Sequence, residues 1–219
     1  MTSLFLIGNI ASGKSTAARY FACRGARCID LDRFAKDLYV PGSDIVNELV
    51  QEFGVEILDA FGGVDAHQLA SRAFESPSAT KRLNDIVHPV LKSRLVQVLM
   101  PVPCASMAMG SRLTVVEASV PEAVRDLFPL VDEVLAICAP YEIRRQRAIA
   151  RGMDPDDFAH RASRQPSDAA IATMATSIID NSYRDVHEFE DALDDWLLQR
   201  GLSGSLGCSE VACSEVAHD

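Results

Sequence analysis

Residues 8–15 read Gly-Asn-Ile-Ala-Ser-Gly-Lys-Ser and complete the phosphate-binding pattern G-x-x-x-x-G-K-[ST]. Such a loop wraps backbone N–H groups around phosphate oxygens when it connects a strand to a helix, and the apolar residues 4–7 and helix-prone residues 16–21 supply those flanks. We expect Lys14 to bridge the β- and γ-phosphates and the Ser15 hydroxyl to ligate Mg²⁺. The expected nucleotide contacts in the loop are Gly8, Ala11, Ser12, Gly13, Lys14, Ser15 and Thr16.

Carboxylates follow the second and third predicted strands. Asp30 and Asp32 come at the end of the second, before a helix that begins near Arg33, and Glu117 ends the third. Ligands of doubly wound sheets bind at the carboxyl ends of strands, so we expect these acids at the edge that holds the phosphate loop. In an extended segment Asp30 and Asp32 share a face, where one could accept a proton from a substrate hydroxyl and the other could help hold Mg²⁺. Alternatively, Asp32 caps the helix and Asp30 is a turn residue. In either case Glu117 could reach Mg²⁺ through water.

Arginines recur at helical spacing over residues 141–172. They are Arg144, Arg145, Arg147, Arg151, Arg161 and Arg164. Spacings of three and four place Arg144, Arg147 and Arg151 on one helix face. Gly152 should end that helix, and Asp154 should cap the next. In an acidic chain this group predicts a clamp for bound phosphates, and a merely solvated face is the alternative.

The composition is that of one α/β domain with its own core. Of 219 residues, 48% are hydrophobic and 24% are charged, and no stretch approaches the ~18 uninterrupted apolar residues of a membrane span. The N-terminus runs into the first strand without a signal sequence, so we expect a cytoplasmic protein. A net charge of −10 argues against nucleic-acid binding, which needs a basic face. The six cysteines lie mostly in apolar runs and predict no disulfide framework.

Short apolar runs alternate with longer helical stretches, which predicts a parallel sheet with helices on both faces. The candidate strands are 4–7, 27–29, 113–117, 133–138 and 177–179. Helical periodicity between the second and third strands, for example over 45–53 and 87–99, predicts a helical insertion. The expected fold class is therefore α/β, a three-layer fold of the P-loop nucleoside triphosphate hydrolase type with a parallel five-stranded sheet.

The C-terminal region divides into a helix and a tail. Apolar residues at helical spacing predict an amphipathic helix over 185–196. After Gly201 the composition turns to Gly and Ser, and Cys-Ser-Glu-Val-Ala occurs twice in tandem over 208–217. From this composition we expect a flexible tail over 201–219. Its two cysteines and one histidine fall short of a closed zinc site.

The chain resembles the dephospho-coenzyme A kinase family from residue 3 to about residue 195. The matching segments are the phosphate loop, Ile29-Asp30-Leu31-Asp32 with Ala35-Lys36, Phe53-Gly54, Ile57-Leu58, Leu69 through Phe74, Leu83-Asn84, His88-Pro89, Arg147, Arg151, Gln165 and Ile179-Asp180-Asn181-Ser182. Their order and spacing make the resemblance specific.

This resemblance implies transfer of the γ-phosphate of ATP, with Mg²⁺, to the ribose 3′-hydroxyl of dephospho-coenzyme A. It implies that Asp32 is the general base and that Lys14 and Arg147 stabilise the transferred phosphoryl group, with Arg147 and Asn181 also at the nucleotide. The implied acceptor contacts are Asp30, Asp32, His88, Pro89 and Arg151. A monomer or weak homo-oligomer is expected.

The resemblance also implies a division of the kinase domain, residues 1–200. Its core comprises residues 1–40, 111–140 and 173–200. A helical insertion that binds the coenzyme covers about 41–110, and a helical lid covers about 141–172.

Two departures from the family pattern leave other functions open. Asn9 and Ala11 replace two glycines of the family's Gly-Gly-Ile-Gly, and residues 118–123 replace its Pro-Leu-Leu-aromatic-Glu. No Asn-Lys-x-Asp guanine signature occurs, which argues against a GTPase. The alternatives are a P-loop kinase of another small hydroxyl or nucleotide acceptor, or a nucleotide-binding regulator with impaired catalysis.

Overall fold

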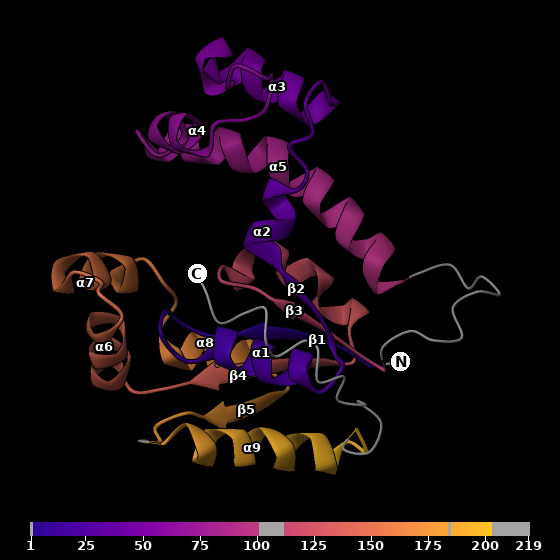
Figure 1. The fold of residues 1–219 in the computed structure, drawn as a ribbon, viewed down its shortest axis with the longest axis vertical. Helices are drawn as coiled ribbons and strands as arrows, with labels where there is room; N and C mark the ends of the chain where they lie inside the picture. Colours follow the sequence, from indigo (N-terminus) through magenta and orange to yellow (C-terminus); the bar gives the residue numbers. More distant parts are fainter. Residues whose placement is uncertain (1, 101–111, 184, 203–219) are drawn as a thin grey trace. The chain divides into compact units, whose positions relative to one another are not determined.

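The computed structural model describes residues 2–100, 112–183 and 185–202 (Figure 1). Its contacts divide the chain into two compact units, one from residues 1–31 and 102–219 and the other from residues 32–101. The tandem repeat of the tail and its candidate metal ligands lie outside the described residues. Among the helices that the structure describes, none has the length and apolar character needed to cross a membrane.

The first unit contains a parallel sheet with the strand order β2-β3-β1-β4-β5. The strands are β1 (Thr2–Ile7), β2 (Arg27–Asp30), β3 (Leu113–Glu117), β4 (Glu133–Cys138) and β5 (Ser177–Asp180). The register pairs Leu6 with Glu117 and Asp30 with Glu117, so the carboxyl ends of the first three strands lie at one edge. The α/β class and the five-stranded parallel sheet predicted from the sequence are thereby confirmed.

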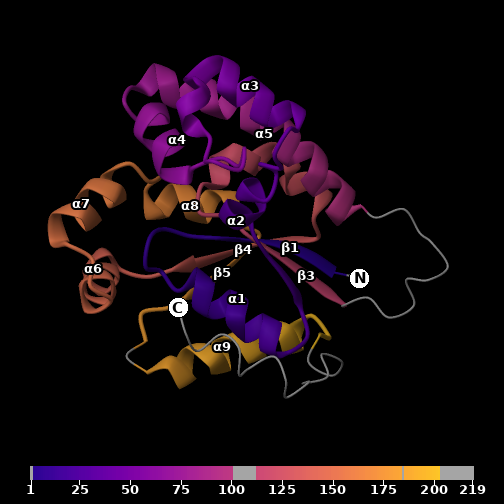
Figure 2. The ribbon, with the colours of Figure 1, turned by 45° about the horizontal axis from the view of Figure 1, so that its top comes forward.

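Two helices cover one face of this sheet, as Figure 2 shows: α1 (Lys14–Cys23) and α9 (Val186–Gln199). They form a single core with the sheet because their apolar residues, among them Phe21, Phe189 and Trp196, pack on the alternate strand residues that point to this side. The helix expected over 185–196 is confirmed as α9, with Asp185 as its N-cap. Leu202, which the sequence placed in the tail, is buried in the same core.

The opposite face carries the 3-10 segment η2 (Pro121–Leu130) and helix α8 (Asp168–Met174), neither of which the sequence predicted. The ring of Phe128 lies 5.0 Å from that of Phe5 in β1. Because both faces are covered, the central strands β3, β1 and β4 are largely apolar and buried, whereas the edge strands β2 and β5 are mostly half-buried or exposed. The first unit thus has the three layers expected of this fold class.

Between β4 and α8 the chain forms a pair of helices, α6 (Tyr141–Ala150) and α7 (Pro155–Ser163). Asp154 caps α7 as predicted, since its side chain accepts from the backbone N–H groups of Asp156 and Asp157. Gly152 has a φ of 88°, which a residue with a Cβ rarely adopts, and the chain reverses there. We call α6 and α7 the arm.

The second unit is helical. Its elements are α3 (Asp44–Phe53), η1 (Val55–Ile57), α4 (Ala66–Ala73) and α5 (Pro77–Leu99), and α2 (Leu31–Lys36) crosses the division between the units. Leu49, Phe53 and Ile57 are buried in a core that contains residues of α3, η1, α4 and α5. The helices predicted over 45–53 and 87–99 are confirmed as α3 and the second half of α5.

Candidate active site

The phosphate loop follows β1 and ends in α1, as its pattern requires. Gly8 and Gly13 have φ values of 150° and 110°. A Cβ on Gly8 would overlap the Ile137 carbonyl oxygen, and one on Gly13 would overlap the Asn181 amide nitrogen. Both glycines are therefore needed for the close approach of the loop to β4 and to the residues that follow β5.

Ala11 lies in the left-handed region, with a φ of 58°. Among the described residues it is the one non-glycine with a positive φ. An alanine in this conformation costs about 1–2 kcal/mol relative to a right-handed conformation, because its Cβ approaches the following carbonyl oxygen. The loss of a glycine at this position therefore leaves the loop strained.

Lys14 points back into the loop. Its Nζ donates to the carbonyl oxygens of Gly8, at 2.8 Å, and Asn9, at 3.2 Å, and the residue is only 7% exposed. A charged ammonium that is held at the centre of a ring of backbone amides is well placed to meet phosphate oxygens.

Ser15 and Glu117 meet at the carboxyl end of the sheet. The Ser15 hydroxyl donates to Glu117 Oε1 at 2.7 Å, which joins the start of α1 to the end of β3. A hydroxyl and a carboxylate are the oxygen donors that Mg²⁺ prefers, and Mg²⁺ that acts on phosphates is bound by few protein ligands together with the phosphate oxygens. The two residues therefore fit the metal role predicted for them.

Arg147 in α6 reaches the other side of the loop. Its Nη2 donates to Asn181 Oδ1 at 3.3 Å and to the Tyr183 carbonyl at 3.0 Å, while the Asn181 amide donates to the Ser12 carbonyl at 2.8 Å. Arg147 Nη1 is buried and has no hydrogen-bond partner among the residues that the structure describes. Such an orphan donor is costly unless an acceptor arrives, which points to a ligand with acceptor oxygens.

The electrostatics of Arg147 favour an anion. Burial, and then the neighbouring charge of Arg151, lower the pKa of the Arg147 guanidinium. Both effects oppose the charged form, and a phosphate placed beside the two arginines would reverse them.

A cavity of about 200 Å³ opens beside these groups. It is lined by Gly13, Thr16, Arg147, Arg151, Asn181, Tyr183, Asp185, Val186 and Phe189. Its polar lining comes from the phosphate loop and the start of α1, from Arg147 and Arg151, and from residues 181–185 after β5, and its apolar lining comes from the start of α9. The structure thus brings Gly13 and Thr16, two of the predicted nucleotide contacts, together with Arg147, Arg151 and Asn181.

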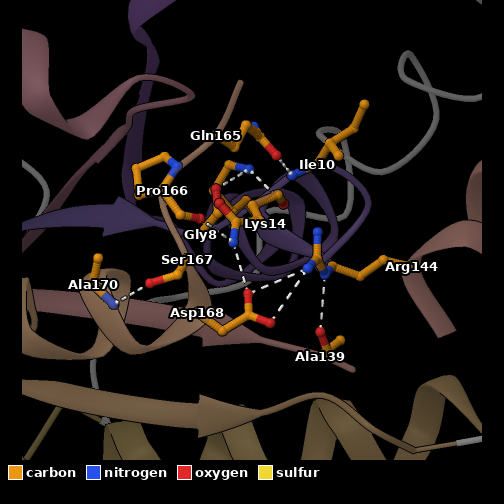
Figure 3. Close-up of polar contacts among 11 residues, drawn as sticks. Gly8, Ile10, Lys14, Ala139, Arg144, Gln165, Pro166, Ser167, Asp168 and Ala170 are labelled. Carbon is orange, nitrogen blue, oxygen red and sulfur yellow. Dashed lines mark hydrogen bonds and ion pairs between the residues drawn. The ribbon is translucent and has the colours of Figure 1, made fainter. Parts of the chain in front are cut away.

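Arg144 lies apart from this cavity, although it shares a helix with Arg147. Its side chain is 6% exposed, its Nε donates to the Ala139 carbonyl at 2.9 Å, and its Nη2 lies 3.3 Å from both carboxylate oxygens of Asp168 (Figure 3). The sequence grouped Arg144 with the phosphate clamp. In the structure its guanidinium is occupied by protein acceptors, because α6 starts against the base of α8.

Asp30 and Asp32 do not continue one extended segment. Asp30 is the last residue of β2, whereas Asp32 lies in the first turn of α2, which begins at Leu31. The alternation of side chains that was expected to place both acids on one face ends with the strand. Asp32 is also inside the helix, so it is not the N-cap that the alternative interpretation made it.

The predicted acceptor residues His88 and Pro89 lie in the middle of α5 in the second unit. Proline inside a helix removes one backbone donor, here toward the carbonyl of Asp85, and favours a bend. His88 is half-buried and Pro89 is exposed. Their roles, like that of Asp32, remain predictions.

A phosphate loop between β1 and α1, a parallel sheet with β1 at its centre, and an arm that carries arginines define a P-loop kinase. A family model described as "Dephospho-CoA kinase" matches residues 3–186, and the chain belongs to this family.

Known proteins support this assignment. A dephospho-CoA kinase of Corynebacterium diphtheriae is 38% identical over 190 residues, which cover 86% of this chain and 92% of that protein. The structure of TT1252 from Thermus thermophilus is similar with a TM-score of 0.69 at 25% identity, and the match covers 94% of this chain and 98% of that one. The structure of a dephospho-CoA kinase from Campylobacter jejuni has the same fold, with a TM-score of 0.65 at 18% identity over 91% of this chain and 98% of that one.

Proposed function

We propose that this chain transfers the γ-phosphoryl group of ATP to the ribose 3′-hydroxyl of dephospho-coenzyme A, giving coenzyme A and ADP. The observation that carries the proposal is the convergence of the phosphate loop, Arg147 and Asn181 on one cavity in a chain of this family.

The donor side of the reaction belongs to the first unit. The loop amides and Lys14 bind the β- and γ-phosphates, and Arg147 uses its buried Nη1 on a phosphate oxygen. Ser15 and, through water, Glu117 would hold Mg²⁺, which when bound neutralises charge on the phosphates. Asn181 fixes the loop against the residues after β5, so that the loop keeps its shape when the nucleotide enters.

The acceptor side follows from the resemblance. Asp32 takes the proton of the ribose 3′-hydroxyl as that oxygen attacks phosphorus, and Asp30, His88, Pro89 and Arg151 contact dephospho-coenzyme A. We further propose a coenzyme-binding insertion over about 41–110, a lid over about 141–172, a cytoplasmic location, and a monomer or weak homo-oligomer.

The experiment that tests the substrate is a comparison of acceptors. Purified protein with ATP and Mg²⁺ is offered dephospho-coenzyme A, shikimate or AMP, and ADP release is followed with each. We expect turnover with dephospho-coenzyme A at least about a hundredfold above that with either other acceptor, because specific hydrogen-bonded recognition rejects the wrong acceptor strongly. Equal or greater turnover with another acceptor would overturn the proposal.

A further inference from the structure

The stretch 165–168, between the arm and α8, is attached to the phosphate loop by side-chain hydrogen bonds. The Asn9 amide nitrogen donates to Asp168 Oδ1 at 2.7 Å and to the Pro166 carbonyl at 3.1 Å. The backbone N–H of Ile10 donates to Gln165 Oε1 at 2.7 Å. Figure 3 shows Gln165, Pro166 and Asp168 gathered against this loop. Two consecutive loop residues are thus held from outside the loop.

The attachment continues into the arm through Asp168. The carboxylate that accepts from Asn9 also faces Arg144 Nη2, and Arg144 Nε is bound to the Ala139 carbonyl at the end of β4. Asn9 is 5% exposed and the Arg144 side chain 6%, whereas the Asp168 side chain between them is 49% exposed. Two of the three partners are therefore buried. We call Asn9, Asp168 and Arg144 the loop brace.

The loop brace lies next to the strained residue of the loop. Ala11, with its φ of 58°, comes two residues after Asn9. Strained backbone persists only where its surroundings over-determine it, and a left-handed alanine left to itself would leave the conformation that aims the loop amides at phosphate. Hydrogen bonds at residues 9 and 10 fix the chain just before that turn.

We propose that Asn9 and Asp168 are positioning residues for ATP, which hold the phosphate loop in its binding conformation despite Ala11, with Arg144 fixing the Asp168 carboxylate. The two departures from the family's Gly-Gly-Ile-Gly then belong together. Asparagine at position 9 supplies the external attachment that alanine at position 11 requires, and a loop with glycine at position 11 would not depend on it. The proposal deepens the proposed kinase function and rests on ATP as the donor.

A double-mutant cycle tests this dependence directly. ATP binding in the presence of Mg²⁺ is measured by isothermal titration calorimetry for the wild type, Asn9→Ala, Ala11→Gly and the double variant. We expect Asn9→Ala to weaken binding about tenfold, the loss that follows when a charge-assisted hydrogen bond is removed. In the Ala11→Gly background the same substitution should change the affinity by about twofold or less. Equal losses in the two backgrounds, or no loss in either, would overturn the proposal.

A second variant tests Asp168, the residue of the loop brace that binds Asn9. Asp168→Asn keeps the shape of the side chain and removes the charge that Asn9 and Arg144 share, so we expect a loss of ATP affinity of about fivefold. The matched control is Asp194→Asn, which removes an exposed ion pair with Arg24 at the end of α1 remote from the phosphate loop, and should leave ATP affinity unchanged. If both variants bound ATP equally well, Asp168 would have no positioning role.

Kinetics separate this inference from a general loss of structure and from a failure of the proposed function. For Asp168→Asn the KM for ATP should rise while the KM for dephospho-coenzyme A stays the same, and thermal unfolding should begin well above the assay temperature. Equal rises in both KM values would mean a merely structural role. A wild type that binds ATP with the expected cycle but does not phosphorylate dephospho-coenzyme A would overturn the proposed function and leave the loop brace standing.

Discussion

The two terminal nitrogens of the Arg147 guanidinium have different surroundings. Its Nη2 binds Asn181 and the Tyr183 carbonyl, while Nη1 is buried and finds no hydrogen-bond partner in the described part of the chain. A planar fork can serve both sides at once, whereas a lysine ammonium on a flexible stem cannot. This arrangement predicts that lysine cannot replace arginine at this position.

Arg147→Lys should lower kcat at least about tenfold, even though the charge is kept, because the contact that develops on the transferred phosphoryl group is lost. The measurement is steady-state phosphotransfer. The matched control is Arg24→Lys, since Arg24 pairs with Asp194 of α9 and touches none of the cavity residues. A kcat for Arg147→Lys equal to that of the control would contradict the role given to this arginine.

Asp32→Asn tests the proposed general base. The substitution removes a proton acceptor and keeps the size of the side chain, so kcat should fall about a hundredfold or more while the KM for ATP changes little. Steady-state kinetics with each substrate varied in turn gives kcat and the KM for ATP separately. A variant that loses only ATP affinity would instead make Asp32 a metal or nucleotide contact.

The sequence could predict the site residues that belong to a local motif. It could not predict those that reach the site through a contact with a distant part of the chain. The loop and the pair Arg147 and Arg151 were all visible as motifs, and the structure gathers them at one cavity. Asp168 was missed, because no spacing relates it to Asn9, from which 159 positions separate it. The nearest local signal was Ser167, whose hydroxyl caps α8 and so could have indicated a helix start there.

The packing of neighbouring elements depends on a polar cluster at the start of β4. Glu133 accepts from Arg200 at the end of α9, at 2.7 Å, and from Thr176 and Ser177 at the start of β5. The side chains of Arg200 and Glu133 are 23% and 20% exposed. Burial alone would raise the pKa of Glu133, but these hydrogen bonds together outweigh burial and lower it.

Glu133→Gln should therefore lower the free energy of unfolding by about 2 kcal/mol at neutral pH, because the half-buried guanidinium of Arg200 loses its counter-charge. A carboxyl whose folded pKa is depressed stabilises fully above its unfolded pKa of about 4.3, and that stabilisation is lost as the pH falls through the lower, folded value. The difference between wild type and variant should thus shrink in acid.

Urea unfolding at neutral pH and at a pH below the ordinary carboxyl pKa measures this effect. Asp85→Asn, which removes an exposed pair with Lys81 in α5, serves as the control and should change the stability by less than about 0.5 kcal/mol. A difference between wild type and Glu133→Gln that stays constant with pH would show that Glu133 acts by packing alone.

The elements that the sequence predicted well are those whose apolar periodicity is long or flanked by clear signals. All five strands, the helices α3 and α9, and the second half of α5 fall in this group. The short helix α8 and the 3-10 segment η2 were missed, because segments of seven and ten residues are too short to show a clear periodicity. The shared face expected for Asp30 and Asp32 was wrong, because the helix starts at Leu31.

The folded part of the chain extends past residue 200, where the composition placed the start of the tail. Leu202 is 5% exposed and belongs to the core of α1 and α9, and its backbone N–H donates to the Leu197 carbonyl at 3.0 Å. Composition could not reveal this, because a single leucine after a glycine carries no periodicity.

Two truncated chains, one ending at Arg200 and one ending at Leu202, measure this contribution. Burial of one leucine is worth about 2 kcal/mol, so the shorter chain should unfold about 5 °C lower in a chain of this size. Differential scanning calorimetry gives the two Tm values. Equal values would mean that Leu202 does not contribute to the core.

We propose that the γ-phosphoryl group of ATP passes to dephospho-coenzyme A at the phosphate loop. The most direct measurement follows a radiolabelled γ-phosphate in a single reaction of purified protein, Mg²⁺, labelled ATP and dephospho-coenzyme A. We predict that the label appears in coenzyme A as a 3′-phosphate, and that Lys14→Ala abolishes this transfer while its circular dichroism spectrum remains that of the wild type. Label that appears only as inorganic phosphate, or transfer that continues in Lys14→Ala, would contradict the claim.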